Sequence, residues 1–216
     1  MSLLKKQCSN VTKARAYMSI VMASFEEEDI INNECLNELI KYHPTKQIEN
    51  VEWLKMKKPS NNFRTLALNY KNSITGEVDN ISWHMCITNL YGRWNSSKAH
   101  IADVKKAFRY DSYNGTTRAF RRNNTTNCMG ICASCNITTS DIEVDHFPLP
   151  FKEIIKTFIK DNDITLSNVQ CTELHNTSLI LTDRSLSNHW VEYHDSVATY
   201  RLLCRSCNRK NGSYGY

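Results

Sequence analysis

Two pairs of cysteines have the spacing of a metal site. Cys132 and Cys135 form one Cys-x2-Cys pair, and Cys204 and Cys207 form a second pair near the other end of the same half of the chain. Four thiolates are the donor set of a tetrahedral structural zinc site, and each close pair can supply two neighbouring ligands. Cys128, four positions before Cys132, is an alternative ligand. We therefore expect a zinc ion that joins the two segments, and because such a site is closed, any chemistry must use other groups.

An acid and a base lie next to each other between the two pairs. Asp145 and His146 end the stretch Ile-Glu-Val-Asp-His-Phe, which is strand-like and stops at prolines 148 and 150. Neighbouring side chains of a strand point to opposite faces, so one of the two could bind a metal while the other faces a substrate. Histidine titrates near neutral pH and is suited to act as a general base. The alternative is that both residues make structural hydrogen bonds only.

The order of these residues resembles that of the HNH, or ββα-metal (His-Me finger), endonucleases. The matching set is a Cys-x2-Cys pair, Asp-His at a strand end, and a second Cys-x2-Cys pair followed at once by Asn208; it is most similar to the zinc-stapled type that includes phage endonuclease VII. The resemblance covers residues from about 128 to 210. It implies that His146 is the general base and that Asp145 and Asn208 hold one catalytic Mg2+ or Mn2+, separate from the structural Zn2+. Carboxylate and amide oxygens are the ligands that such ions prefer.

The chain departs from that family pattern in two places. About 55 residues separate the Asp-His strand from the second cysteine pair, where compact members have a short loop. Thr199 stands near the position at which many relatives carry an asparagine, which leaves the backbone support of His146 open. For His189 and His194 we expect a packing or surface role, because their spacing does not put them on one helix face.

Positive charge is concentrated in one window. The chain has 27 Lys and Arg against 22 Asp and Glu, and residues 98–123 contain seven basic and two acidic residues, so this window carries the whole net charge of +5. Aromatic residues alternate with these charges, a mixture that can hold phosphates and stack on bases. A solvated helix face with a linker is the alternative. The residues expected to contact DNA are Lys105, Lys106, Arg109, Arg118, Arg121, Arg122, Arg205, Arg209 and Lys210.

The hydrophobic pattern predicts an α+β fold. Helical periodicity covers residues 13–25, 34–42, 98–108 and 151–159, and a further helix is expected to start at residue 187 or 188. Strand patterns cover residues 63–70 and 80–88 around a hairpin loop at 73–77, whereas 118–127 is expected to be a polar connector. We expect three regions: an N-terminal helical arm (1–45), an α+β region that engages DNA (46–123), and a C-terminal ββα-metal module stapled by the four cysteines (124–216).

Composition indicates a folded protein without a membrane segment. The 216 residues are 41% hydrophobic and 23% charged, which is ordinary for a globular protein. No apolar run reaches the roughly 18 to 20 residues that cross a bilayer, and the first residues lack a secretory signal. We therefore expect a cytoplasmic protein, in whose reducing environment close cysteine pairs more often bind metal than form disulfides.

These observations lead to one main functional hypothesis and two alternatives. The main hypothesis is a metal-dependent DNA endonuclease that hydrolyses phosphodiester bonds. A zinc-stapled nucleic-acid-binding module without catalysis is the first alternative, and a nuclease directed at RNA is the second. If cleavage of both strands is symmetric, a homodimer with two sites is expected.

Overall fold

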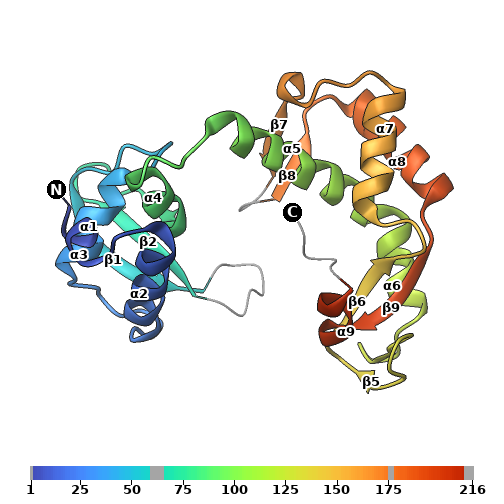
Figure 1. Ribbon diagram of the computed structural model, residues 1–216, viewed down its shortest axis with the longest axis horizontal. Helices are drawn as coiled ribbons and strands as arrows, with labels where there is room; N and C mark the ends of the chain where they lie inside the picture. Colours follow the sequence, from blue (N-terminus) through green and yellow to red (C-terminus); the bar gives the residue numbers. More distant parts are fainter. Residues whose placement is uncertain (1, 59–65, 175–177, 212–216) are drawn as a thin grey trace. The chain divides into compact units, whose positions relative to one another are not determined.

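The computed structural model describes residues 2–58, 66–174 and 178–211. It is a mixed α+β structure that separates into two compact units, Met1–Ser96 and Ser97–Tyr216 (Figure 1). The boundaries expected from the sequence lie after residues 45 and 123. Among the described residues, none of the helices combines the length and the apolar character that a segment crossing a bilayer requires.

The first unit packs helices on a three-stranded antiparallel sheet. The sheet order is β1-β2-β3, and twenty buried residues of the described chain form one core between sheet and helices. Polar side chains begin the four α-helices of this unit, since Ser2, Asn10, Asn33 and Ser82 each accept a hydrogen bond from a backbone N–H of the first turn. The elements are α1 (Leu3–Gln7), α2 (Val11–Ala23), α3 (Glu34–Leu39), η1 (Ile40–Tyr42), β1 (Val51–Lys57), β2 (Ala67–Asn72), β3 (Val78–Ile81) and α4 (Trp83–Leu90).

Most elements of the first unit follow their sequence pattern, but the predicted strand at 80–88 is wrong. The helices expected at 13–25 and 34–42 are confirmed within about two residues, and β2 and β3 form the expected hairpin. Residues 63–65 of the other predicted strand lie outside the described residues. The strand at 80–88 ends at Ile81 because the Ser82 hydroxyl caps α4 by accepting from the Met85 N–H at 3.4 Å. Cys86, Ile87 and Leu90 then lie buried on one helix face.

The second unit begins with a long helical segment. In it α5 (Ser96–Ser112) confirms the helix expected at 98–108, and it continues through the π-helical turn η2 (Tyr113–Thr117) into α6 (Arg118–Asn123). The connector predicted at 118–127 is therefore wrong for its first six residues, because a helix already running through η2 continues across them. This segment belongs to the same unit as the cysteine pairs.

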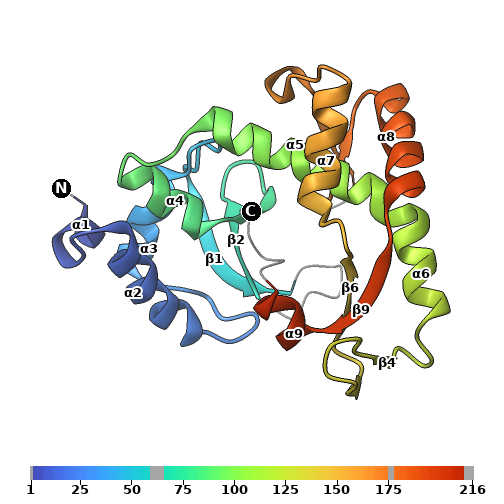
Figure 2. The same ribbon diagram turned by 45° about the vertical axis from the view of Figure 1, so that its right-hand side comes forward.

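The cysteine half of the second unit contains a pair of strands followed directly by a helix. Strand β6 (Ile142–His146) confirms the strand expected at the Asp-His pair, and it pairs antiparallel with β9 (Tyr200–Cys204). Helix α9 (Arg205–Lys210) starts at the next residue and is six residues long. Figure 2 shows β6 and β9 side by side with α9 at their end.

The long insertion between β6 and β9 folds against α5. It contributes α7 (Phe151–Asp161), η3 (Leu166–Asn168), the hairpin of β7 (Cys171–Leu174) and β8 (Ser178–Leu181), and α8 (Arg184–Val197). Trp190 of α8 is fully buried, and its indole N–H donates to the backbone oxygen of Phe108 at 2.7 Å. The expected helix at 151–159 is confirmed, whereas α8 begins three residues before the predicted start because Asp183 caps it. The insertion thereby positions α8 next to the end of β6.

Candidate functional site

The four cysteines expected to form a metal site lie together. The sulfur atoms of Cys132, Cys135, Cys204 and Cys207 are all within 4.8 Å of one another, and Sγ of Cys135 is 3.8 Å from Sγ of Cys204. With Zn–S bonds of about 2.3 Å, the sulfur atoms of a tetrahedral site are about 3.8 Å apart. The cluster is therefore consistent with a structural zinc site, as predicted. Cys128 is exposed and lies outside the cluster, so the alternative that it replaces Cys132 is wrong.

Backbone hydrogen bonds hold the two cysteine pairs in place. The first pair lies in a tight turn between β4 (Gly130–Ile131) and β5 (Thr138–Thr139), and Asn136 adopts a left-handed backbone with φ of 59° to close it. The Ala133 N–H donates to the oxygen of Leu202 at 2.8 Å, which attaches this turn to β9. The second pair begins α9, because Cys204 is its N-cap.

The core beneath the cluster is small. Cys132, Ile142, Leu202 and Leu203 are its four buried members, with Phe120 of α6 packed against them. A Cβ on Gly130 would lie 3.0 Å from a methyl of Leu202, so even this turn packs tightly. Burial opposes ionisation of the Cys132 thiol, but donation from neighbouring N–H groups outweighs it and lowers its pKa to about 6. A low thiol pKa favours the thiolate that a metal binds.

One face of β6 carries acidic groups toward α9. Glu143 and Asp145 alternate with Val144, and the side-chain amide of Asn208 donates to Oε2 of Glu143 at 2.6 Å. Asp145 is 2.8 Å from the guanidinium of Arg201, its partner on β9. Asp145 and Asn208 are the residues expected to hold one catalytic cation. In the structure Asp145 pairs with Arg201 and Asn208 with Glu143, because the strand register places Arg201 opposite Asp145.

Asn208 has an unsatisfied acceptor. The residue is buried, and its Oδ1 has no hydrogen-bond partner among the described residues. A buried carbonyl oxygen without a partner costs free energy and is uncommon in folded proteins. Carboxylates of Glu143 and Asp145 on the facing strand and this amide oxygen together make a donor set that suits a hard divalent cation. Sequence reasoning missed Glu143, although its position two residues before Asp145 puts it on the same strand face.

The opposite face of β6 carries the histidine site. His146 is half-buried, and its Nε2 lies 3.0 Å from Nε2 of His194, which is fully buried on α8. Burial, with the charges of His194 and Arg109, lowers the pKa of His146 to about 4. Burial also lowers the pKa of His194, against the opposing effect of Asp195. Both imidazoles are therefore neutral near pH 7, the form in which a ring nitrogen can accept a proton.

His194 makes a contact that its spacing from His189 does not indicate. The predicted packing role is right about its burial but omits its hydrogen bond to His146. The informative spacing is the four residues from the buried Trp190, and not the five residues from His189, which is exposed. Thr199 supports the end of β6 by donating its hydroxyl to the backbone oxygen of Phe147, and the Phe147 N–H donates to the backbone oxygen of Thr199 at 3.1 Å.

The basic residues expected to bind DNA occupy two helical segments of the second unit. Those on α9 directly follow the cluster, and all three are exposed. On α5, Lys105 is exposed, Lys106 makes an exposed ion pair with Asp103, and the Arg109 guanidinium lies 4.4 Å from the ring centre of Phe151. On α6, Arg118 and Arg122 are exposed and Arg121 is half-buried.

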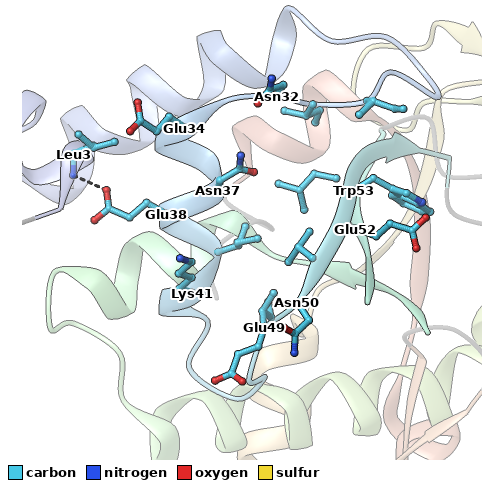
Figure 3. Close-up of a pocket in the computed structure, with 16 residues that line it drawn as sticks. Leu3, Asn32, Glu34, Asn37, Glu38, Lys41, Glu49, Asn50, Glu52 and Trp53 are labelled. Carbon is cyan, nitrogen blue, oxygen red and sulfur yellow. Dashed lines mark hydrogen bonds between the residues drawn. The ribbon is translucent and has the colours of Figure 1, made fainter. Parts of the chain in front are cut away.

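The first unit contains a pocket of a different electrostatic character. It has a volume of about 860 Å³ and is lined by α3, β1 and the segments beside them. Figure 3 shows four carboxylates, from Glu34, Glu38, Glu49 and Glu52, against one ammonium group, from Lys41 (Figure 3). Glu38 accepts from the backbone N–H of Leu3 at 2.8 Å. Such a lining repels phosphate, so this pocket does not suit a nucleic-acid ligand.

Comparisons with known proteins add no relative. No family model matches the chain, and neither a curated protein nor a solved structure does. A functional assignment therefore depends on the geometry of the cysteine cluster, the acidic face and the histidine pair.

Proposed function

We propose that the protein is a metal-dependent nuclease that hydrolyses phosphodiester bonds of DNA, with the β6, β9 and α9 segment as an HNH-type ββα-metal module. The observation that carries the proposal is the unsatisfied amide oxygen of Asn208 beside Glu143, on a helix that directly follows the strand pair. The cysteine cluster supports it, because it fixes the start of α9 relative to the strand that bears Asp145 and His146.

The donor chemistry of the acidic face fits Mg2+ or Mn2+ better than a soft metal. Glu143, Asp145 and Asn208 offer oxygen ligands only, whereas the four cysteines offer sulfur. When bound, such a cation would offset the negative charge that builds on the phosphate during hydrolysis. In the structure, the ion pair with Arg201 holds the carboxylate of Asp145 in place, and the hydrogen bond from Asn208 holds that of Glu143.

His146 has the properties of a general base. Its imidazole is neutral at physiological pH, and it lies at the end of β6, half-buried, where water can reach it. Its neighbour Asp145 points to the other strand face, so the proton acceptor and the acidic groups use separate faces of one strand. Exposed Arg205, Arg209 and Lys210 on α9 would contact phosphates next to this module.

A plasmid-nicking assay tests the proposal. The zinc-loaded protein should convert supercoiled plasmid to nicked or linear forms with Mg2+ or Mn2+ and not with EDTA. The His146→Ala variant should lose about 10²- to 10⁴-fold in cleavage rate, the usual contribution of a general base, and retain DNA binding. His189→Ala, which removes an exposed histidine of α8, is the matched control and should cleave like the wild type. Equal cleavage by the His146→Ala variant would overturn the proposal.

A non-catalytic DNA-binding module is the second candidate, and one observation favours it. The Asp145–Arg201 ion pair and the Glu143–Asn208 bond give both carboxylates a protein partner without any cation. In that case the acidic face is structural, and the protein binds DNA in a salt-dependent manner without requiring Mg2+. Binding without cleavage at every metal concentration would select this candidate. Parallel assays on RNA test the third possibility.

A further inference from the structure

The histidine pair is the inner end of a hydrogen-bonded series that reaches η2. His146 and His194 approach through their Nε2 atoms at 3.0 Å, and Nδ1 of His194 lies 3.2 Å from Oδ1 of Asp195. At 3.0 Å the two nitrogens share a single hydrogen, so one Nε2 carries it and the other accepts. Which Nε2 carries this hydrogen depends on whether Nδ1 of His194 donates or accepts in its contact with Asp195.

The carboxylate of Asp195 sets the direction of the series. An ionised carboxylate only accepts hydrogen bonds, so the hydrogen between it and His194 must be on Nδ1 of His194. A neutral His194 with its hydrogen on Nδ1 has a lone pair on Nε2, and it must accept from Nε2–H of His146. The opposite arrangement would put a ring lone pair against the carboxylate at 3.2 Å, which is repulsive.

Hydroxyl groups on the other side of Asp195 agree with this direction. Thr116 lies 2.6 Å from the same Oδ1 and must donate to it, so its oxygen is left to accept from the Tyr200 hydroxyl at 2.7 Å. The Thr117 hydroxyl in turn donates to Tyr200 at 3.1 Å. Every hydrogen bond in the series is therefore donated in the direction of Asp195, and each group has a donor hydrogen or a lone pair for each of its bonds.

The backbone of η2 is shaped to bring these groups to Asp195. Gly115 breaks the helix with φ of −84° and ψ of −128°, which turns Thr116 and Thr117 toward α8 and β9. A Cβ at Gly115 would lie 3.0 Å from Oδ2 of Asp195, so a larger residue would push the carboxylate away. Short π-helical turns inside helices occur often at functional sites.

We propose that His194 and Asp195 are positioning residues that fix the tautomer of His146, with hydrogen on Nε2 and the proton-accepting lone pair on Nδ1. Among the described residues, Nδ1 of His146 makes no hydrogen bond, and it is not one of the buried atoms without a partner, so solvent reaches it. The catalytic meaning of this tautomer rests on the proposed nuclease function, but the tautomer itself follows from the hydrogen bonds alone. The role resembles that of carboxylates that orient a histidine through its second nitrogen.

Imidazole nitrogen NMR tests the tautomer without any nuclease substrate. In full-length, zinc-loaded protein labelled with 15N-histidine, long-range 1H–15N spectra distinguish protonated from unprotonated ring nitrogens at pH 7. The expected pattern is an unprotonated Nδ1 and a protonated Nε2 in His146, with the reverse in His194. The His146→Gln and His194→Gln variants assign the signals. A protonated Nδ1 in His146 would overturn the proposal, whether or not the protein cleaves DNA.

Asp195→Asn tests the positioning role. The Asn amide can donate to Nδ1 of His194 and so reverse both tautomers, which should lower plasmid cleavage by about 100-fold or more while leaving zinc content and DNA affinity unchanged. Glu192→Gln removes one exposed negative charge from the same helix and should change neither spectrum nor cleavage. Loss of activity in Asp195→Asn with both tautomers retained would contradict the inference.

Two substitutions of His194 distinguish the positioning role from a purely structural one. His194→Phe keeps an aromatic ring among Phe151, Trp190 and Tyr200 but removes the acceptor, and it should inactivate the enzyme. His194→Gln supplies an amide oxygen that can accept from His146 and should recover part of the activity. Equal activity of the two variants would contradict the inference. If the wild-type protein shows the expected tautomers but cuts no DNA under any condition, the hydrogen-bond series stands and the proposed function fails.

Discussion

The first unit and the ββα segment of the second unit are stabilised in different ways. The first unit buries twenty residues of its described chain in one core, whereas the segment of β6, β9 and α9 rests on four buried residues and the cysteine cluster. Buried apolar area supplies most of the folding free energy of a domain, and small cores usually need a metal or disulfide in addition. The comparison teaches that the candidate site is built on the part of the molecule least able to fold without a ligand.

Removal of the metal ligand Cys207 should produce the largest difference between the two regions. Structural zinc contributes on the order of 10 kcal/mol to the folding of small zinc modules, so Cys207→Ala should unfold β6, β9 and α9 and leave the first unit folded. Hydrogen exchange by mass spectrometry should show protection lost from residues 130–146 and 200–210 only. Cys128→Ser, at an exposed cysteine outside the cluster, is the control and should keep its zinc. Unchanged protection in Cys207→Ala would break the comparison.

Truncation of Trp190 should have the next largest effect. Trp190→Ala leaves a cavity between α5, α7 and α8 and removes the hydrogen bond to the backbone oxygen of Phe108, and comparable substitutions cost about 3 to 5 kcal/mol. Urea unfolding followed by a second-unit probe should show that loss, whereas the first unit should unfold as in the wild type. Val197→Ala, at an exposed position of the same helix, should change stability by less than about 0.5 kcal/mol.

The lowered pKa of His146 should make the stability of the second unit depend on pH. The folded pKa of His146, about 4, lies below its ordinary value of 6.5, so the unfolded chain binds more protons between those values. Its contribution to stability is therefore complete above pH 6.5 and is lost as pH falls toward 4. After allowance for partial solvent exposure, we expect the contribution of His146 to the free energy of unfolding to be about 2 kcal/mol. Urea unfolding at pH 7 and at pH 5 measures how the free energy of unfolding changes with pH. The His146→Gln variant should show a smaller change.

Single surface charges should have the smallest effects. Lys105→Gln on α5 should weaken DNA binding slightly and reduce the salt dependence of the affinity by about one phosphate contact. Lys41→Gln, in the acidic pocket of the first unit, should leave DNA affinity unchanged. Fluorescence anisotropy over a range of salt concentrations compares the two variants. A larger loss of DNA affinity in Lys41→Gln than in Lys105→Gln would indicate that the DNA-binding surface lies on the first unit.

The sequence predicted the elements whose pattern is strong and local. Helix α7 follows from apolar residues at helical spacing, β6 from its alternation and the prolines after it, and the cysteine cluster from two short spacings whose ligand chemistry is restrictive. Residues 80–88 were misassigned because β-branched and aromatic residues outweighed the serine cap that starts α4. A helix N-cap is a single residue, so it has little weight in a prediction when the residues after it have high strand propensity.

The candidate site was predicted only in part, for a physical reason. Which atoms meet across the strand pair depends on the register of β6 with β9, and no sequence spacing fixes that register across an insertion of about 55 residues. Register is what pairs Asp145 with Arg201. The insertion also brings His194 to His146, and such a tertiary contact could be inferred only by placing His194 on the buried face of α8 with Trp190.

Cut-site mapping on an end-labelled DNA duplex tests the central claim most directly. With zinc-loaded protein and Mg2+ or Mn2+, we predict discrete backbone cuts that disappear in EDTA and in the His146→Ala variant and persist in His189→Ala. Intact duplex at every metal concentration, under conditions where the protein is shown to bind it, would contradict the account.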